Sequence, residues 1–146
     1  MSFASDVQRW ADEVAGGNLD QVVRALRLQA LEGVIEKMPV DTGQAKGATF
    51  VSIGAPSSQV SGQEDSSPLG SSANAVARAQ SVINSNTDQI FYITNNLPYV
   101  PLLEFGGYGM GPKTINGFSI QAPEGMFRIT AVELRDGVRR IVNGLA

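Results

Sequence analysis

The stretch from Leu19 to Met38 limits the possible folds of this chain most strongly, because it has the pattern of one long amphipathic helix. Asn18 is a favourable N-terminal cap, and Pro39 predicts the end of the helix because the residue before a proline is pushed out of the helical region. The apolar positions form two adjoining stripes: Leu19, Val22, Val23, Leu26, Ala30 and Val34 make the first, and Leu28, Leu31, Ile35 and Met38 make the second.

The width of this apolar arc leaves two interpretations open. A helix that covers one side of a sheet needs only one stripe of about 100°. Either this helix lies at the centre of the monomer, or its second side meets another subunit. In the second case Leu28, Leu31 and Ile35 are candidates for the interface.

The remaining regular patterns predict a single α+β domain. We expect helices over residues 3–15, 73–83 and 123–143, a helical turn over 98–105, and strands over 48–53, 89–94 and 118–120. The stretch 54–72 is rich in serine, glycine and proline and has no hydrophobic period, and the stretch 106–117 holds five glycines and a proline, so we expect long flexible loops at both places. This order predicts a small antiparallel sheet packed against long amphipathic helices in residues 18–146, preceded by a helical arm over residues 1–17.

Apolar spacing also predicts which side of each helix is buried. The arm has a stripe that docks either on the protein's own body or on a neighbouring subunit: Phe3, Val7, Trp10, Ala11 and Val14. The expected buried side of helix 73–83 consists of Ala73, Val76, Ala77, Gln80 and Ile83. The last helix would begin at Pro123, and its stripe consists of Phe127, Ala131, Leu134, Val138, Ile141 and Leu145.

Composition excludes several classes of function. The chain has no cysteine and no histidine, so thiol nucleophiles, imidazole catalysis and Cys/His zinc sites are absent. Its 11 basic and 14 acidic residues give a net charge of −3, which argues against tight nucleic-acid binding but not against a surface that DNA slides past. Uninterrupted apolar runs are only a few residues long, so we expect no membrane span.

Asp41 and Glu104 are the best-placed carboxylates for acid–base chemistry, but structural roles explain them better. An aspartate in a turn accepts hydrogen bonds from backbone N–H groups two residues on, and we expect this of Asp41. Glu104 is expected to cap a turn or to pair with an arginine. Lys46 is a base only in principle, and Glu64 and Asp65 are expected to be solvated loop acids.

The glycine-rich stretch Gly106–Gly111 does not have the features of a phosphate-binding loop. No Gly-Lys-Ser/Thr ending follows it, and neither a strand before it nor a helix directly after it is expected. We therefore expect a protein that is not an enzyme and needs no cofactor and no metal.

Three segments resemble the tail-completion proteins, which are small neck or minor tail proteins of long-tailed bacteriophages. Met38-Pro-Val-Asp-Thr-Gly43 is similar to the family's P-V-D-T-G signature after a long helix. Ile93-Thr-Asn-Asn-Leu-Pro-Tyr-Val-Pro-Leu-Leu-Glu-Phe-Gly-Gly107 is similar to its strand followed by N-x-x-x-Y-x-x-x-L-E-x-G. Gln121-Ala-Pro-Glu-Gly-Met126 looks like its A-P-x-G-M segment. Besides the three helix positions above, the resemblance makes these residues structural or interface candidates: Pro39, Asp41, Thr42, Gly43, Tyr99, Leu103, Glu104 and Gly106.

The resemblance implies a structural virion protein that finishes the head-proximal end of a tail and helps join it to the capsid neck. It implies self-association into a ring, often a hexamer, with genomic double-stranded DNA passing through the lumen without sequence-specific contacts. The implied partners are neck or connector proteins and tail-terminator or tail-tube proteins, and the implied location is the virion, after assembly in the host cytoplasm. A tail-terminator or head–tail connector ring, a cell-wall hydrolase and a cytoplasmic interaction module stay open as alternatives.

Overall fold

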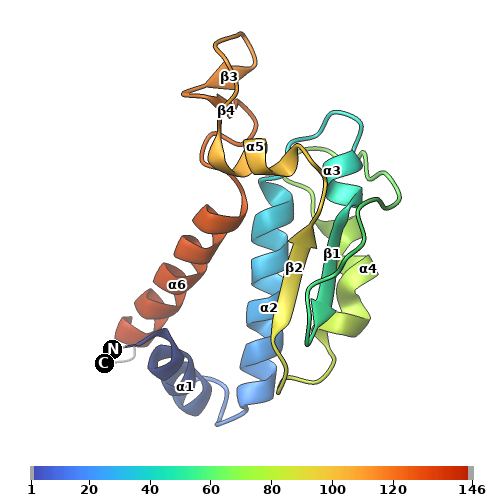
Figure 1. The fold of residues 1–146 in the computed structure, drawn as a ribbon. Helices are drawn as coiled ribbons and strands as arrows, with labels where there is room; N and C mark the ends of the chain where they lie inside the picture. The colour runs from blue at the N-terminus through green and yellow to red at the C-terminus, as the bar shows by residue number, and fades with distance from the viewer. Residues whose placement is uncertain (1, 145–146) are drawn as a thin grey trace.

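The computed structural model describes residues 2–144, which contain six helices and two two-stranded antiparallel sheets (Figure 1). This arrangement confirms the predicted α+β class. The elements are α1 (Phe3–Glu13), α2 (Leu19–Glu36), α3 (Gln44–Gly47), β1 (Thr49–Ile53), α4 (Ala73–Ile83), β2 (Phe91–Asn95), α5 (Val100–Phe105), β3 (Thr114–Ile115), β4 (Phe118–Ser119) and α6 (Phe127–Gly144). No helix within residues 2–144 has both the length and the apolar character needed to cross a membrane.

Helix α2 is the central element of the monomer (Figure 1). Asn18 caps it as predicted, because its side-chain oxygen accepts a hydrogen bond from the backbone N–H of Gln21 at 3.1 Å. The helix ends at Glu36, and Met38 follows it as a fully buried residue. Helices α1, α4 and α6 all pack against α2.

This central position decides between the two interpretations of the wide apolar arc. Leu31 and Ile35 are each 1% exposed and pack against α4, and the half-buried Leu28 joins the same cluster. The three residues therefore belong to the protein's own core, and in this conformation Leu31 and Ile35 present no surface to another subunit.

The sheet of β1 and β2 faces α2 and α4. Its register pairs Thr49 with Asn95 and Ile53 with Phe91. Phe91 and Ile93 share the face that packs on the α2–α4 cluster, as the alternation in the sequence predicted.

The predicted buried side of α4 is correct for Ile83 and for the half-buried Val76 and wrong for the other three residues. Ala75, Ala79 and Ile83 are buried, whereas Ala73, Ala77 and Gln80 are exposed. Alanines occur on all sides of this helix, so the apolar pattern does not select one face. The packing partners α2 and β1 select it instead.

A buried arginine on α2 holds the turn between α4 and β2. Arg27 is 4% exposed, and its guanidinium donates hydrogen bonds to four backbone carbonyls, those of Ile83, Ser85, Asn86 and Gln89. Burial lowers the pKa of Arg27, and the nearby charge of Arg24 lowers it further. The guanidinium thereby satisfies carbonyls at the C-terminal end of α4, which have no partners within the helix.

Helix α6 begins at Phe127 and not at Pro123, and its buried side is rotated from the prediction. Of the predicted stripe, Val138 is buried and Phe127 and Leu134 are half-buried, whereas Ala131 and Ile141 are exposed. Thr130 and Val142, which were not predicted, are buried. The predicted stripe also included Leu145, which lies outside the described residues. The rotation follows from close packing on α2, where a side chain at Gly33 would collide with the methyl group of Thr130, whose hydroxyl bonds Lys37.

The N-terminal helix α1 docks on the protein's own body, against α6 and α2 (Figure 1). Ala11 is fully buried in this contact. Asp6 is 4% exposed, and its carboxylate lies 3.5 Å from the guanidinium of Arg139. Met1, the first residue of the predicted arm, lies outside the described residues.

Both stretches predicted as loops contain more structure than expected. Residues 54–72 form no helix or strand, yet part of this stretch is packed against α3, a short helix that the sequence pattern does not predict. Residues 106–117 include β3, which pairs with β4 across Asn116 and Gly117. Both turn residues have positive φ, 51° and 82°, as a tight two-residue hairpin requires.

Candidate functional site

The two segments 39–43 and 99–106 meet at one open groove, although they are far apart in the sequence. The groove has a volume of about 790 Å³. It is lined by residues 39–45, Tyr99, Leu103, Tyr108, Lys113, Thr114 and residues 119–121. Of the candidates named from the resemblance, six line the groove: Pro39, Asp41, Thr42, Gly43, Tyr99 and Leu103. Glu104 and Gly106 do not line it.

Asp41 has an exposed carboxylate at the rim of the groove. The predicted bond from this carboxylate to a backbone N–H two residues on is wrong. Within residues 2–144 the carboxylate makes no hydrogen bond, and it is the Thr42 hydroxyl that accepts one from the backbone N–H of Gln44, at 3.3 Å. Thr42 thus takes the role that was predicted for Asp41, because its hydroxyl lies beside the first backbone N–H of α3, that of Gln44.

Gly43 fixes the entry into α3. Its φ of 86° is in the left-handed region that favours glycine, and its carbonyl accepts hydrogen bonds from the backbone N–H groups of Gly47 and Asp65, both at 3.0 Å. A side chain here would collide with the backbone carbonyl of Asp65. The glycine that ends the first segment is therefore required by both its conformation and its packing.

Glu104 caps helix α6. One carboxylate oxygen accepts hydrogen bonds from the backbone N–H groups of Met126 at 2.8 Å and Phe127 at 2.9 Å. The other accepts from the backbone N–H of Arg128 at 2.9 Å and from its guanidinium at 3.1 Å. Both predicted roles of Glu104, capping and pairing with an arginine, are thus confirmed. Burial alone would raise the pKa of this carboxyl, but these bonds lower it below its usual range.

Arg128 completes the connection between α5 and α6. Its guanidinium donates a 2.7 Å hydrogen bond to the backbone carbonyl of Glu104 and lies 4.4 Å from the centre of the Phe105 ring. Gly125 has a φ of 79°, and a side chain there would approach the Glu104 carbonyl to 2.7 Å. The chain before α6 therefore turns closely around Glu104.

Gln121 joins the third segment to the first. Its side-chain oxygen accepts a hydrogen bond from the backbone N–H of Val40 at 2.8 Å, and its amide group donates one to the Val40 carbonyl at 3.3 Å. Together with the Glu104 cap, these bonds connect segments 39–43, 99–106 and 121–126 into one unit.

Tyr99 lies half-buried in the groove, 3.4 Å from the side-chain oxygen of Gln44. Burial raises the pKa of its hydroxyl, and the charges of Tyr108 and Asp41 raise it further. The phenol therefore stays neutral at physiological pH and acts here as a hydrogen-bond donor.

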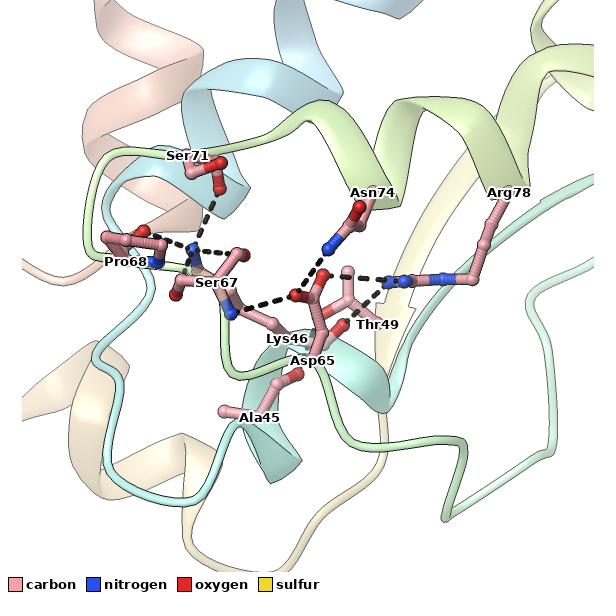
Figure 2. A network of polar contacts seen from close by, with 9 residues as sticks. All are labelled: Ala45, Lys46, Thr49, Asp65, Ser67, Pro68, Ser71, Asn74 and Arg78. Carbon is pink, nitrogen blue, oxygen red and sulfur yellow. Dashed lines mark hydrogen bonds and ion pairs between the residues drawn. The ribbon is translucent and has the colours of Figure 1, made fainter.

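A buried lysine in α3 holds the long loop of residues 54–72 in place (Figure 2). Lys46 is 0% exposed, and its ammonium donates to the backbone carbonyls of Pro68 at 2.9 Å and Ser71 at 2.8 Å, and to the carbonyl and hydroxyl of Ser67 at 3.3 Å. Burial lowers the pKa of Lys46, and the charge of Asp65 opposes this shift. The contacts give Lys46 a structural role, in place of the base considered from the sequence.

Asp65 is the acidic partner in the same network, so the expectation of a solvated loop acid is wrong for this residue. Asp65 is 4% exposed. Its carboxylate accepts hydrogen bonds from the backbone N–H of Ser67 and from the side chains of Asn74 and Arg78 (Figure 2). Burial would raise the pKa of Asp65, but these hydrogen bonds lower it to about 2. The Asp-Ser-Ser sequence, in which aspartate bonds an N–H two residues on, is the signal that would have identified it.

Protonation of Asp65 is expected to destabilise the fold in acid. Its pKa is about 2 in the folded protein and about 3.9 in an unfolded chain. Because the folded value is the lower one, the stabilisation is present above the unfolded pKa and is lost as the pH falls from about 5 towards 2, a total of roughly 2 kcal/mol. Urea unfolding across this range should give Asp65→Asn a flatter pH dependence than the wild type. The exposed neighbour Glu64 supplies the control, since Glu64→Gln should keep the wild-type slope, and equal slopes for all three proteins would contradict the prediction.

Within residues 2–144, no three side chains of His, Cys, Asp or Glu type lie close enough together to hold a metal ion. The groove instead offers a mixed apolar and hydrogen-bonding surface, with one free carboxylate at Asp41 and one lysine at Lys113. Comparisons with protein-family models, with curated proteins and with solved structures find no match for this chain.

Proposed function

We propose that this chain is a structural virion protein that completes the head-proximal end of a phage tail and helps join the tail to the capsid neck. In this role it forms a ring around the DNA channel. The proposal comes from the resemblance of three segments to the tail-completion family, and one feature of the fold supports it.

The supporting observation is that the three segments form one connected unit, although the family pattern treats them only as stretches in a fixed order. Gln121 bonds the backbone of Val40, and Glu104 bonds the backbone of residues 126–128. Residues that are far apart in the sequence thereby shape a single groove. A partner protein that docks in this groove would therefore contact residues from all three segments at once.

The charge of the chain is compatible with this proposal. A net charge of −3 gives no excess of cations to hold phosphates, so DNA can move past the subunits. Ring formation requires different patches on the two sides of each subunit. The groove is a candidate for one of these patches.

Deleting the gene from the phage or prophage that encodes the chain tests the proposal. Electron microscopy of the lysate should show DNA-filled heads and separate tails of normal length, and expression of the wild-type chain in trans should restore joined particles. Mass spectrometry of purified particles should find the chain in the tail fraction.

Other results would redirect or reject the proposal. Abnormally long tails would indicate a tail terminator, because a terminator stops tail polymerisation. Copurification with heads alone would indicate a head–tail connector. Normal, infectious particles that contain none of the chain would reject a virion role.

A further inference from the structure

The sheet of β1 and β2 has two unpaired edges. Among the described residues it contains only these two strands, which lie side by side without a third strand next to either of them (Figure 1). Each strand is therefore an edge strand, with one row of backbone N–H and C=O groups that points away from the pair. Such a row is a template on which a further strand can pair.

The hydrogen-bond pattern shows which backbone groups point outward. The N–H of Gly54 donates to the carbonyl of Ile90 at 2.9 Å. Hydrogen-bonded and non-hydrogen-bonded pairs alternate along an antiparallel ladder, so in this register the groups of residues 50, 52, 92 and 94 face the partner strand. Apart from the strand ends, the outward groups belong to four residues: Val51 and Ile53 in β1, and Phe91 and Ile93 in β2.

Nothing in the described part of the chain covers these outward groups. Within residues 2–144 no hydrogen bond reaches the outward N–H and C=O groups of the four residues, and none of the four is buried. Backbone polar groups are almost never both buried and unpaired, so these groups face solvent. Monomeric proteins usually protect an exposed edge with charged residues or proline, but residues 49–53 and 91–95 contain neither. Both edges are therefore open to pairing.

We propose that the β1 edge of one copy pairs with the β2 edge of the next copy, so that one sheet runs continuously around the ring. The register within one chain places Val51 opposite Ile93 and Ile53 opposite Phe91, and it is these residues that face outward on the two edges. The same register between copies makes both of these pairs hydrogen-bonded. Rotation about a ring axis keeps every β1 parallel, so β2 of one copy and β1 of the next run antiparallel, as they do within the chain.

A second copy is the occupant that fits both edges. A strand from an unrelated partner would cover one edge and leave the other open, whereas copies that pair β1 with β2 leave no edge open once the ring closes. Val51, Phe91 and Ile93 all pack towards the α2–α4 cluster, so a neighbouring strand in this register continues the apolar side of the sheet. The two edges are different surfaces, and the contact is therefore heterologous. This inference rests on the proposed function, because it supplies the contact that builds the ring.

Amide hydrogen exchange in purified protein tests the contact directly. When the concentration is raised so that the monomer assembles, the outward N–H groups of Val51, Ile53, Phe91 and Ile93 should exchange at least about tenfold more slowly. The N–H groups of residues 50, 52, 92 and 94 are the internal control, because they are already hydrogen-bonded in the monomer and should change much less. Sedimentation velocity on the same samples measures the extent of self-association.

A charge placed on one edge provides a second test. Ile53→Lys should weaken self-association by at least about tenfold, because an edge lysine opposes the pairing of a further strand. Val132→Lys is the matched control, because Val132 is also β-branched but lies on α6, where it is 42% exposed. The control variant should associate as the wild type does, and circular dichroism checks that both variants are folded.

Single cysteines identify which edges meet, because the chain has no cysteine of its own. Ile53→Cys marks β1, and Ile90→Cys marks the start of β2, where Ile90 is 68% exposed. A short bismaleimide should join the two variants to each other when they are mixed, and should join like variants much less. Cross-links that form mainly between like variants would show that identical edges meet, and would overturn the proposed pairing of β1 with β2.

A wild-type chain that stays monomeric at every attainable concentration would also overturn the inference, as would self-association that leaves the outward N–H groups exchanging as they do in the monomer. These outcomes are separable from failure of the proposed function. A chain that is present in the tail fraction but assembles without protecting these groups keeps the function and loses the inference. A chain that assembles through the two edges but is absent from particles keeps the contact and loses the virion role.

Discussion

Replacing Glu104 with alanine is expected to lower the free energy of unfolding by about 4 kcal/mol. The carboxylate accepts three backbone N–H groups at the start of α6 and the guanidinium of Arg128. Alanine leaves all four donors without this partner, and the N–H of Met126 lies in a fully buried residue. Urea unfolding measures the loss, and hydrogen exchange should show faster exchange at residues 126–130 than in α2.

Two further substitutions separate the cap from the mere loss of a carboxylate. Glu104→Gln keeps one accepting oxygen and should cost roughly half as much as the alanine change. Glu124→Ala removes an exposed glutamate in the chain leading into α6 and should change stability by less than about 0.5 kcal/mol. Similar losses in Glu104→Ala and Glu124→Ala would contradict the role of Glu104 as the cap.

Replacing Lys46 with methionine is expected to lower the free energy of unfolding by about 3 kcal/mol. Methionine fills a similar volume, but the carbonyls of Ser67, Pro68 and Ser71 lose a common donor. The loop should then detach from α3 before the rest of the fold opens. Limited proteolysis should therefore cut the variant within residues 62–72 under conditions in which the wild type stays intact.

Lys113→Met is the matched control for this substitution, because Lys113 is an exposed lysine just before β3. It should leave both the stability and the cleavage pattern unchanged. Resistance of Lys46→Met to proteolysis, together with wild-type stability, would show that the packing of Gly43 and Gly47 is enough to hold the loop.

Elements governed by local periodicity could be predicted from the sequence. The cap at Asn18 and the alternation of Phe91 and Ile93 follow from side-chain chemistry and spacing within a few residues. The two roles of Glu104 follow from its side-chain chemistry, but its partners at residues 126–128 could not be named from the sequence. The resemblance to the tail-completion family, and not periodicity, singled out the segments that line the groove, and it did not show that they meet.

Features set by tertiary packing could not be predicted in the same way. The alanines of α4 do not distinguish one side from another, and the rotation of α6 depends on the close contact of Gly33 with Thr130. Arg27 and Lys46 look like surface cations in the sequence, yet each is buried and holds backbone carbonyls of a distant segment. No period in the sequence marks a side chain whose partner is the backbone of another segment.

The pairing of β1 with β2 has a consequence for how fast the chain folds. Residues 49–53 pair with residues 91–95, so the loop pinned by Lys46 and the whole of α4 lie between the two strands. The entropy of closing this long intervening segment must be overcome before the strand pair contributes its hydrogen bonds, which slows folding relative to a bundle of neighbouring helices. The packing of α4 on α2 joins segments that are equally far apart in the sequence, so we expect the α2–α4 contact and the sheet to form together in one late step. A newly made chain would then present its finished groove only after this slowest step.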